Sequence, residues 1–441
     1  MKKYETYKDS GLEWLGMVPE HWGIVPLKYL LSEPLQYGAN ESADNCNPSE
    51  PRYIRITDIT EDGKLRKSTY RTLPYQKAEG YMLKKGDILF ARSGATVGKT
   101  FIFEEDYDAC FAGYLIKASC NEKLLPMFLY YFTSSNSYEN WKNSTFNQAT
   151  IQNIGADKYC TLPIPTPSSE EQEGIINFLS HNVAQIDALI SEKEKMVEDL
   201  KAYRSSLITE TVTKGLDKGV EMKDSGVEWI EKIPATWTTV LLKRCATIMT
   251  GGTPSTDIDR YWANPTFHWY TPSDFSDDDV VLNDSSRKLD KTAIKEHAAK
   301  LFPQNSVLVV GIGATLGKVG ISLNECSSNQ QVNAIIFNPT VLPEYGAYYL
   351  LAGKEYIRSQ SNAATLPILN QSTMGELQIV VPTIDEQKDI VGFINKKVSV
   401  IKESIENLQI QISDLKSYKS SLITEAVTGK IDLRDWQTKK S

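Results

Sequence analysis

The sequence predicts an α+β protein in which two α/β heads are separated by two long helices that pair antiparallel as a coiled coil. Three observations predict this fold: a long unit is repeated, each copy contains a heptad pattern of apolar residues, and short β-rich segments precede each pattern. The predicted division is a first head at residues 1–166, a first helix at 167–214, a second head at 215–381, a second helix at 382–430 and a tail at 431–441.

The repeat is visible at both ends of the unit. The matching segments, each displaced by 215 positions, are Lys8–Trp14 with Lys223–Trp229, Pro19 with Pro234, Trp22 with Trp237, and Ser205–Glu210 with Ser420–Glu425. Between them, Gly94–Lys99 matches Gly313–Lys318 at an offset of 219, so the heads carry different insertions. The repeat therefore predicts one scaffold, with a pseudo-twofold axis, that holds two different heads.

Within the heads, short strands and a few helical stretches are predicted. Residues 53–56, 87–90 and 307–310 have the alternating or β-rich character of strands, and residues 124–138 and 343–359 have helical character.

Each long helix has a start signal and a stop signal. Ser168 with Glu171, and Thr383 with Glu386, have the spacing of a capping box, in which the hydroxyl accepts an unpaired backbone N–H and the glutamate reaches back. Glycines at positions 215 and 429 lie where a helix C-terminus is expected.

The apolar positions of both helices alternate by four and three, which is typical of a coiled-coil seam. They are Leu179, Val183, Ile186, Ile190, Val197, Leu200 and Leu207 in the first helix, and Ile394, Val398, Ile401, Ile405, Leu408, Ile412, Leu415 and Leu422 in the second. Lys193, Arg204 and Lys419 interrupt the pattern. The alternative is two separate amphipathic helices, each docked on its own head. Some forty paired residues would make a rod of roughly 60 Å, the length of about 18 base pairs of DNA.

Composition limits the classes of protein. The net charge of −8 argues against a protein that coats polyanions, but basic residues concentrate locally at 64–99 and 287–318, as on a phosphate-contacting face. Six scattered cysteines and four scattered histidines favour reduced thiols and no metal site. No run of 18 apolar residues occurs, so a cytoplasmic protein is expected.

The glycine loop that ends in Lys99 suggests two kinds of site. A nucleotide-binding phosphate loop needs four residues between its glycines and a following helix, whereas this loop has three residues between Gly94 and Gly98 and a strand-like continuation. A turn that offers backbone N–H groups, a hydroxyl and a lysine to a DNA phosphate fits the residues better. No other catalytic motif is present, which favours a protein that is not an enzyme.

These features together resemble the specificity subunit of Type I restriction-modification enzymes, over nearly the whole chain. The residues that carry the resemblance are Gly11–Trp14 with Pro19 and Trp22, Thr250–Pro254, Tyr261–Trp262, Trp269–Thr271, the loops at Gly94 and Gly313, Ser328–Asn333, and Glu171–Gln172 and Glu386–Gln387 after their prolines. The first head departs from the pattern, because Tyr37-Gly38-Ala39-Asn40 replaces Gly-Gly-Thr-Pro.

The resemblance implies that each head is a target-recognition domain that reads one half of a bipartite, asymmetric double-stranded DNA target. The coiled coil would set the spacer between the halves. The implied partners are two methylation subunits and the restriction and translocation subunits, and S-adenosylmethionine, ATP and Mg²⁺ would belong to those partners. This chain would hold no cofactor, metal or catalytic residue.

The candidate DNA-binding residues follow from the loops and the basic stretches. Lys99 and Lys318 are predicted to contact phosphate with Thr96 and Thr315 beside them, and Arg55, Arg92, Arg260 and Ser273 are further candidates near the groove. Two alternatives stay open at the level of sequence. One is a coiled-coil scaffold without DNA readout, and the other is a nucleotide-binding enzyme that uses the Gly94–Lys99 loop.

Overall fold

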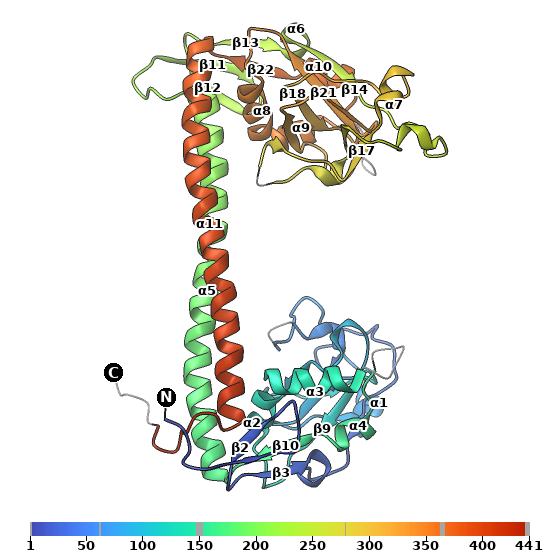
Figure 1. Cartoon of the computed structure of the whole chain (residues 1–441), viewed down its shortest axis with the longest axis vertical. Coiled ribbons are helices and arrows are strands. Elements are labelled where there is room, and N and C mark those ends of the chain that lie inside the picture. Colours follow the sequence, from blue (N-terminus) through green and yellow to red (C-terminus); the bar gives the residue numbers. More distant parts are fainter. Residues whose placement is uncertain (1, 61–62, 147–152, 278, 362–366, 437–441) are drawn as a thin grey trace. The chain divides into compact units, whose positions relative to one another are not determined.

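The computed structural model describes residues 2–60, 63–146, 153–277, 279–361 and 367–436, which form two compact units. Unit 1 comprises Met1–Glu194 and Gln409–Ser441, and unit 2 comprises Lys195–Leu408. Each unit contains one head and a part of both long helices (Figure 1). None of the helices within the described residues is long and apolar enough to cross a membrane.

The two long helices are α5 (Ser169–Lys214) and α11 (Ile384–Val427). Both predicted capping boxes are present. The Glu171 backbone N–H donates to Ser168 Oγ at 3.2 Å, and the Thr383 backbone N–H donates to Glu386 Oε2 at 2.9 Å. Beyond each helix a glycine adopts the left-handed conformation, with φ +74° at position 215 and +70° at position 429, so the expected stop signals are also confirmed.

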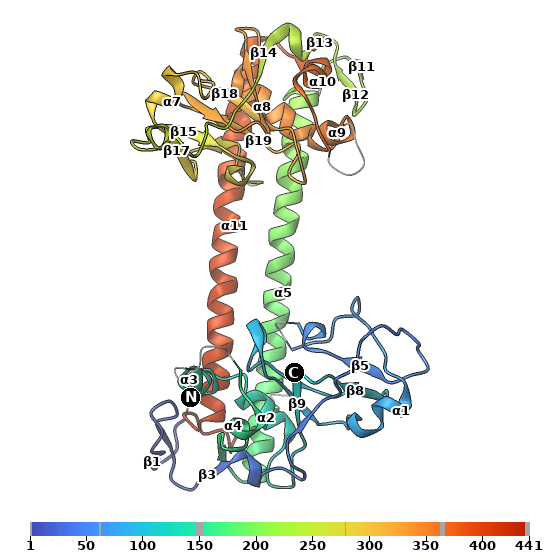
Figure 2. The same ribbon diagram turned by 90° about the vertical axis from the view of Figure 1, so that its right-hand side faces the viewer.

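In unit 1 the two helices lie side by side and run antiparallel (Figures 1 and 2). Three polar contacts join them: Asp187 Oδ1 to Lys419 Nζ at 2.6 Å, Glu194 Oε1 to Lys416 Nζ at 3.1 Å, and Lys193 Nζ to Gln411 Oε1 at 2.7 Å. Two of the charged residues that interrupt the heptads therefore have partners on the opposite helix. The seam between them is buried at Leu179, Ile186, Ile190, Ile412 and Leu422.

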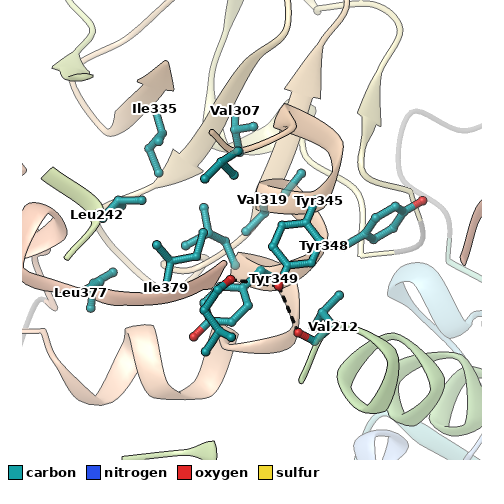
Figure 3. Packing of buried hydrophobic residues seen from close by; sticks show 14 of the residues in the cluster. Val212, Leu242, Val307, Val319, Ile335, Tyr345, Tyr348, Tyr349, Leu377 and Ile379 are labelled. Carbon is teal, nitrogen blue, oxygen red and sulfur yellow. Dashed lines mark hydrogen bonds between the residues drawn. The ribbon is translucent and has the colours of Figure 1, made fainter. Parts of the chain in front are cut away.

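In unit 2 the seam continues into the core of the second head. Ile208 and Val212 of α5 and Ile390 and Ile394 of α11 belong to one buried cluster with the head (Figure 3). Tyr345 from the head donates its hydroxyl to the Val212 carbonyl oxygen at 3.2 Å. The pairing confirms a coiled coil, and the helix ends also dock on the heads.

The first head consists of short strands with helices around them. Its strands are β1 (Tyr7–Asp9), β2 (Met17–Pro19), β3 (Gly23–Pro26), β4 (Gln36–Tyr37), β5 (Arg52–Ile54), β6 (Ile88–Ala91), β7 (Thr100–Ile102), β8 (Ala109–Phe111), β9 (Leu115–Ala118) and β10 (Pro163–Thr166). Its α-helices are α1 (Tyr75–Ala78), α2 (Pro126–Phe132), α3 (Asn136–Phe146) and α4 (Ala156–Cys160), and its 3₁₀ helices are η1 (Leu27–Tyr29), η2 (Ile56–Asp58), η3 (Glu79–Tyr81) and η4 (Gly94–Thr96).

The second head is built in the same way. Its strands are β11 (Met222–Val227), β12 (Ile230–Pro234), β13 (Thr238–Leu241), β14 (Ala246–Thr250), β15 (Phe267–Tyr270), β16 (Val281–Leu282), β17 (Arg287–Leu289), β18 (Ser306–Val310), β19 (Val319–Ser322), β20 (Cys326–Ser328), β21 (Val332–Phe337) and β22 (Gln378–Val381). Its helices are α6 (Leu242–Cys245), η5 (Asp259–Tyr261), η6 (Pro272–Asp274), α7 (Lys291–Lys295), α8 (Pro343–Ala352), α9 (Lys354–Ser359) and α10 (Gln371–Glu376).

The two heads share one strand framework. The main sheet of the first has the order β4-β9-β6-β7, and that of the second has the equivalent order β14-β21-β18-β19 with β16 added at the edge. The parallel pair β5-β8 corresponds to β15-β20, where β17 is added. The sequence predicted two different heads, whereas the structure shows one framework that carries different additions.

The predicted strands and helices are present, with three local differences. The strand expected at 53–56 ends at Ile54, after which Arg55 begins the η2 turn. The helix expected at 124–138 is divided into α2 and α3, because Thr133 and Ser135 donate their hydroxyls to the carbonyls of Tyr130 and Phe132 and so compete with helix continuation. The helix expected at 343–359 is divided into α8 and α9 at the glycine in position 353.

Each head is attached to the start of its long helix by a buried glutamine. The Gln172 amide accepts from the Leu125 N–H at 2.8 Å and donates to the Lys123 and Pro167 carbonyls. Gln387 makes the equivalent contacts with Leu342, Thr340 and Pro382, and both glutamine side chains are fully buried. The repeated Glu-Gln pair therefore caps the helix with one residue and attaches the head with the other.

The tail packs on unit 1. The Asp432 N–H donates to the Lys2 carbonyl at 2.9 Å, so the segment after α11 lies beside the start of the chain. Trp436 packs edge-on against Phe178 of α5, with ring centroids 5.3 Å apart. The domain boundaries expected from the sequence stay a prediction, since the two compact units divide the long helices between them.

Candidate nucleic-acid interface

The two glycine loops are tight turns of β-hairpins. Gly94–Lys99 joins β6 to β7, and Gly313–Lys318 joins β18 to β19. In both turns the first and second glycines have a positive φ, +73° and +83° in the first turn and +91° and +83° in the second, a conformation that other residues rarely adopt. The glycine pattern is therefore a requirement of the turn.

The second half of each turn uses its backbone N–H groups within the hairpin, so the expected contact between turn N–H groups and a phosphate stays a prediction. The Gly98 N–H donates to the Ala91 carbonyl at 2.8 Å, and the Lys99 N–H donates to the Thr96 carbonyl at 3.0 Å. The second turn repeats this pattern at Gly317 and Lys318. These two N–H groups of each turn are therefore already bonded within the hairpin.

The turns also do not lead into a helix. Nucleotide-binding phosphate loops place the N-terminus of the following helix against the phosphates. Here a strand follows each lysine instead.

In the first head, Arg92, Thr96 and Lys99 surround the hairpin turn. The guanidinium carbon of Arg92 lies 4.8 Å from the ring centroid of Tyr37. The Arg92 Nε is buried and has no hydrogen-bond partner among the described residues. Thr96 and Lys99 are half-buried. The hairpin thus presents a stacked arginine beside a threonine and a lysine.

In the second head, Lys318 is held by an acidic residue. Its Nζ lies 3.0 Å from Asp277 Oδ2 and donates to the Phe275 carbonyl at 3.2 Å. Lys354 of α9 contacts the other oxygen of Asp277 at 2.8 Å. The hydrogen bond from Lys354, and then that from Lys318, hold the pKa of the Asp277 carboxyl below its ordinary value despite partial burial.

In the second head, a hydrogen-bond network lies at the position that corresponds to Tyr37 of the first head. Strand pairing places Tyr37 at the position of Thr250, whose hydroxyl donates to Asn333 Oδ1 at 2.7 Å. Asn333 in turn donates to the Leu369 carbonyl at 3.0 Å. The two heads therefore place different polar side chains beside equivalent hairpins.

The strand register corrects the expected alignment by one residue, because Tyr37 corresponds to Thr250 and Gly38 to Gly251, so the first head keeps the first glycine of Gly-Gly-Thr-Pro. A Cβ at Gly38 would collide with the carbonyls of Phe111 and Ala112, and a Cβ at Gly251 would collide with the equivalent Ser328 segment. Gly252 has open space around its Cα, so alanine can replace it in the first head.

The other predicted residues lie elsewhere on the heads. Arg55 forms a two-point contact with the buried Asp58, at 2.8 and 3.0 Å, so its guanidinium stabilises the η2 turn. Arg260 is exposed on η5 and pairs with Glu296 at 2.8 Å. Ser273 is exposed on η6, two residues before Phe275. Their contact with DNA stays a prediction.

In the folded first head, carboxylates from other segments offset part of the positive charge at residues 64–99. Lys77 pairs with Glu41 at 2.6 Å, and Lys85 pairs with Asp106 at 3.2 Å. A count of charges along residues 64–99 misses these carboxylates, because other segments of the chain bring them alongside.

Sequence reasoning missed the cations that later helices bring to the hairpins. Lys142 of α3 packs across Gly98, and Lys354 and Arg358 of α9 pack across Gly317. Arg358 donates Nε to the Leu316 carbonyl at 2.8 Å and so holds the second turn. The glycines indicated only that another side chain packs closely against each turn, and sequence spacing does not identify that side chain.

A cluster of aromatic rings with an arginine was also not predicted as a unit. The guanidinium carbon of Arg287 lies 4.0 Å from the Trp262 ring centroid and 5.2 Å from that of Trp269. Trp269 is buried, as expected for core aromatics, whereas Trp262 is half-buried.

Comparison with known proteins gives a consistent result. The family model described as Type I restriction modification DNA specificity domain matches residues 37–199 and 234–414. The MjaIX specificity subunit of Methanocaldococcus jannaschii is 32% identical over 186 residues, 41% of each chain, so that alignment spans less than half of the relative. The putative MjaX specificity subunit of the same organism is 23% identical over 98% of both chains. The EcoR124I/EcoR124II specificity subunit of Escherichia coli is 23% identical over 75% of this chain and 78% of its own.

Solved structures share the fold. A chain solved in work on complex assembly and conformational transition of the type I R-M system superposes with a TM-score of 0.75 at 15% identity, over 94% of this chain and 99% of its own. The HsdS subunit from Thermoanaerobacter tengcongensis gives 0.50 at 15% identity, over 94% and 98%. With its two hairpin-bearing heads and its paired long helices, the chain belongs to the family of type I restriction-modification DNA specificity domain proteins.

Proposed function

We propose that this chain is the non-catalytic DNA-reading subunit of a type I restriction-modification complex. Each head would read one half of a bipartite target. The observation that carries the proposal is the repeated framework with different side chains beside its hairpins, Tyr37 and Arg92 in one head and Thr250 and Asn333 in the other. A symmetric pair of identical readers selects a palindrome, whereas two dissimilar readers select an asymmetric site.

Within this proposal the hairpins face the DNA backbone. Lys99 and Lys318 contact phosphates, with Thr96 and Thr315 as neighbouring hydroxyl donors. Arg92 is suited to a base edge, because the Tyr37 ring holds its guanidinium and leaves donors for the bidentate contact that arginine makes with guanine. Arg55, Arg260 and Ser273 are further candidates on the same heads.

The paired helices set the spacer in this proposal. Helices of 46 and 44 residues rise about 65–70 Å at about 1.5 Å per residue, which corresponds to roughly 20 base pairs.

The proposed partners follow from the relatives, which are named as subunits of type I enzymes. Two methylation subunits, and the restriction and translocation subunits, would assemble on this chain. Methylation would use S-adenosylmethionine, and translocation and cleavage would use ATP with Mg²⁺, all bound by the partners.

The test is methylation of a random double-stranded DNA library by the full chain assembled with its methylation subunits. We expect methylated molecules to share two short sequences, different from each other, separated by a gap of fixed length and no sequence preference. A single uninterrupted motif would contradict the bipartite arrangement. An assembled complex that neither binds nor methylates DNA would favour the coiled-coil scaffold instead.

A further inference from the structure

The repeat contains one exchange of charge that the helices alone do not explain. At the offset of 215, Asp187 corresponds to Lys402, and Arg204 corresponds to Lys419. In unit 1, Asp187 and Lys419 form an ion pair of 2.6 Å between the two helices. In unit 2, the two corresponding positions are both cationic, so the same ion pair cannot form.

Two residues of the second head supply acceptors for these cations, one through a carboxylate and one through a backbone carbonyl. We name Asp277 together with Asp279 the acidic strap. Arg204 Nη2 of α5 donates to the Asp277 carbonyl at 3.0 Å, and Lys402 Nζ of α11 lies 3.1 Å from Asp279 Oδ2. Two cations on two helices are thus bound by residues two positions apart in the head.

The other side of the strap binds the head itself. The Asp277 carboxylate contacts Lys318 of the hairpin and Lys354 of α9, at 3.0 and 2.8 Å. The strap therefore joins the hairpin that is proposed to contact DNA to both helices of the coiled coil.

Of the contacts that the second head makes with Gln387, Asn395 and Lys402 of α11, the strap makes the one furthest along the helix. Gln387 attaches the head near the start of α11, and Lys402 lies 15 residues further along, roughly 22 Å at about 1.5 Å per residue. The core of the head also packs on Ile208 and Val212 of α5 and on Ile390 and Ile394 of α11, and Tyr348 donates its hydroxyl to Asn395 Oδ1 at 2.6 Å. A contact further along the helix than this core restrains pivoting of the head about the core. In the described part of unit 1 the first head contacts α11 through Asn136, which bonds Ser420 and Thr424 near the end of that helix (Figure 2).

We propose that the acidic strap is a positioning element, which fixes the second head against both helices and thereby determines how strictly the protein discriminates the length of the DNA spacer. The inference rests on the proposed function. A pivoting head would move its hairpin along the DNA and accept spacers one base pair too short or too long. The bases that the head reads would stay the same, because the strap contacts neither Thr250 nor Asn333 in the described structure.

The test uses the full chain assembled with its methylation subunits, on DNA that carries both half-sites with the native spacer or with one base pair more or less. We expect Asp277→Asn to lower the ratio of methylation rates between native and altered spacers by about tenfold, because it removes the charge that joins the strap to both Lys318 and Lys354 and leaves residue 277 its carbonyl contact with Arg204. Asp277→Glu should restore most of the discrimination. Glu325→Gln removes one exposed carboxylate from the same head and should leave the ratio unchanged.

A second variant separates positioning from folding. Lys402→Asp gives unit 2 the charge pattern of unit 1, so the helices gain an ion pair between residue 402 and Arg204 while Asp279 is repelled. We expect an unchanged melting temperature, faster hydrogen exchange in Gly313–Lys318, unchanged exchange in Gly94–Lys99, and the same loss of spacer discrimination. In contrast, Asp187→Lys should lower the melting temperature, because it opposes Lys419 with a like charge.

Several results would overturn the inference. Unchanged spacer discrimination in both Asp277→Asn and Lys402→Asp would do so, as would an altered half-site sequence or complete loss of methylation by a folded variant. These results differ from failure of the proposed function itself, in which the unsubstituted complex would show no bipartite target at all.

Discussion

At the level of single residues, Glu171 connects the entry segment of the first head to its long helix. Its carboxylate lies 2.9 Å from His21 Nε2 and accepts from the Trp22 indole at 3.4 Å, while it also caps α5 through Ser168. Burial opposes ionisation of this carboxyl, but the hydrogen bonds from His21, Trp22 and Ser168 outweigh it and hold its pKa below the ordinary value.

The lowered pKa of Glu171 predicts an acid-dependent loss of stability. A carboxyl with a folded pKa below its unfolded value stabilises the fold above pH about 4.5, and this contribution is lost as the pH falls through the folded pKa. We expect Glu171→Gln to lower the free energy of unfolding at pH 7 by about 1–3 kcal/mol. The thermal unfolding midpoint of unit 1 should fall by several degrees as a result. The difference should narrow below pH 4. The control is Glu170→Gln at the exposed neighbouring position, which should leave the unfolding midpoint unchanged at both pH values. If Glu171→Gln lowered the midpoint equally at all pH values, the role of the Glu171 charge would be contradicted.

The hairpin lysines predict a salt-dependent effect on DNA binding. Lys318→Ala and Lys99→Ala should each weaken the affinity of the assembled complex for all sequences alike, roughly fivefold, and reduce the slope of log affinity against log salt by up to about 0.9. Fluorescence anisotropy at several salt concentrations measures both. Lys28→Ala, an exposed lysine of the first head, is the control. A changed sequence preference would show that these lysines read bases instead of phosphates.

At the level of elements, the attachment of each head depends on one buried amide. Gln172→Ala would leave the Leu125 N–H and the Lys123 and Pro167 carbonyls without their partner, at a cost of about 1–3 kcal/mol. We expect faster hydrogen exchange in α2 with no change in α8. Gln387→Ala should produce the reverse pattern. If either variant made hydrogen exchange equally faster in α2 and in α8, the two attachments would not be independent.

The elements differ in how far the sequence determines them. Caps, heptads and the positive-φ glycines are local requirements, so the long helices and hairpin turns could be predicted with their boundaries. The break between α2 and α3 could not, since it depends on hydroxyls at Thr133 and Ser135 that bond the backbone only in the folded chain. Lys142 and Lys354 reach the hairpins through packing of helices 40 residues or so further along, which no local pattern encodes.

The paired helices predict a change of spacer when both are lengthened. We expect one heptad inserted after Glu194 and another after Gln411, opposite each other in the antiparallel register, to lengthen the coiled coil by about 10 Å without shifting the seam. The preferred spacer should increase by up to about three base pairs. Methylation of a random library reports the spacer and the half-sites together. Altered half-sites with an unchanged spacer would contradict a spacing role for the helices.

At the level of the whole molecule, the repeat separates what is shared from what differs. The strand framework, Gln172 with Gln387, and the hairpin turns are equivalent in the two heads, whereas Tyr37 and Thr250 are not. The sequence showed the shared helices clearly but not the shared heads, because strands need only a general apolar pattern while surface residues change freely. Even the correspondence of Gly38 with Gly251 becomes visible only through strand register.

In the proposed function, each head reads its own half-site on a common scaffold. This proposal is tested most directly by a chain in which residues 20–166 replace residues 235–381, two segments of equal length that follow Pro19 and Pro234. The measurement is the methylation motif of this chain, assembled with its partners, on a random DNA library. We expect a palindromic target, with the half-site of the first head in both arms and the original spacer. An asymmetric target that retains the half-site of the removed head would contradict it.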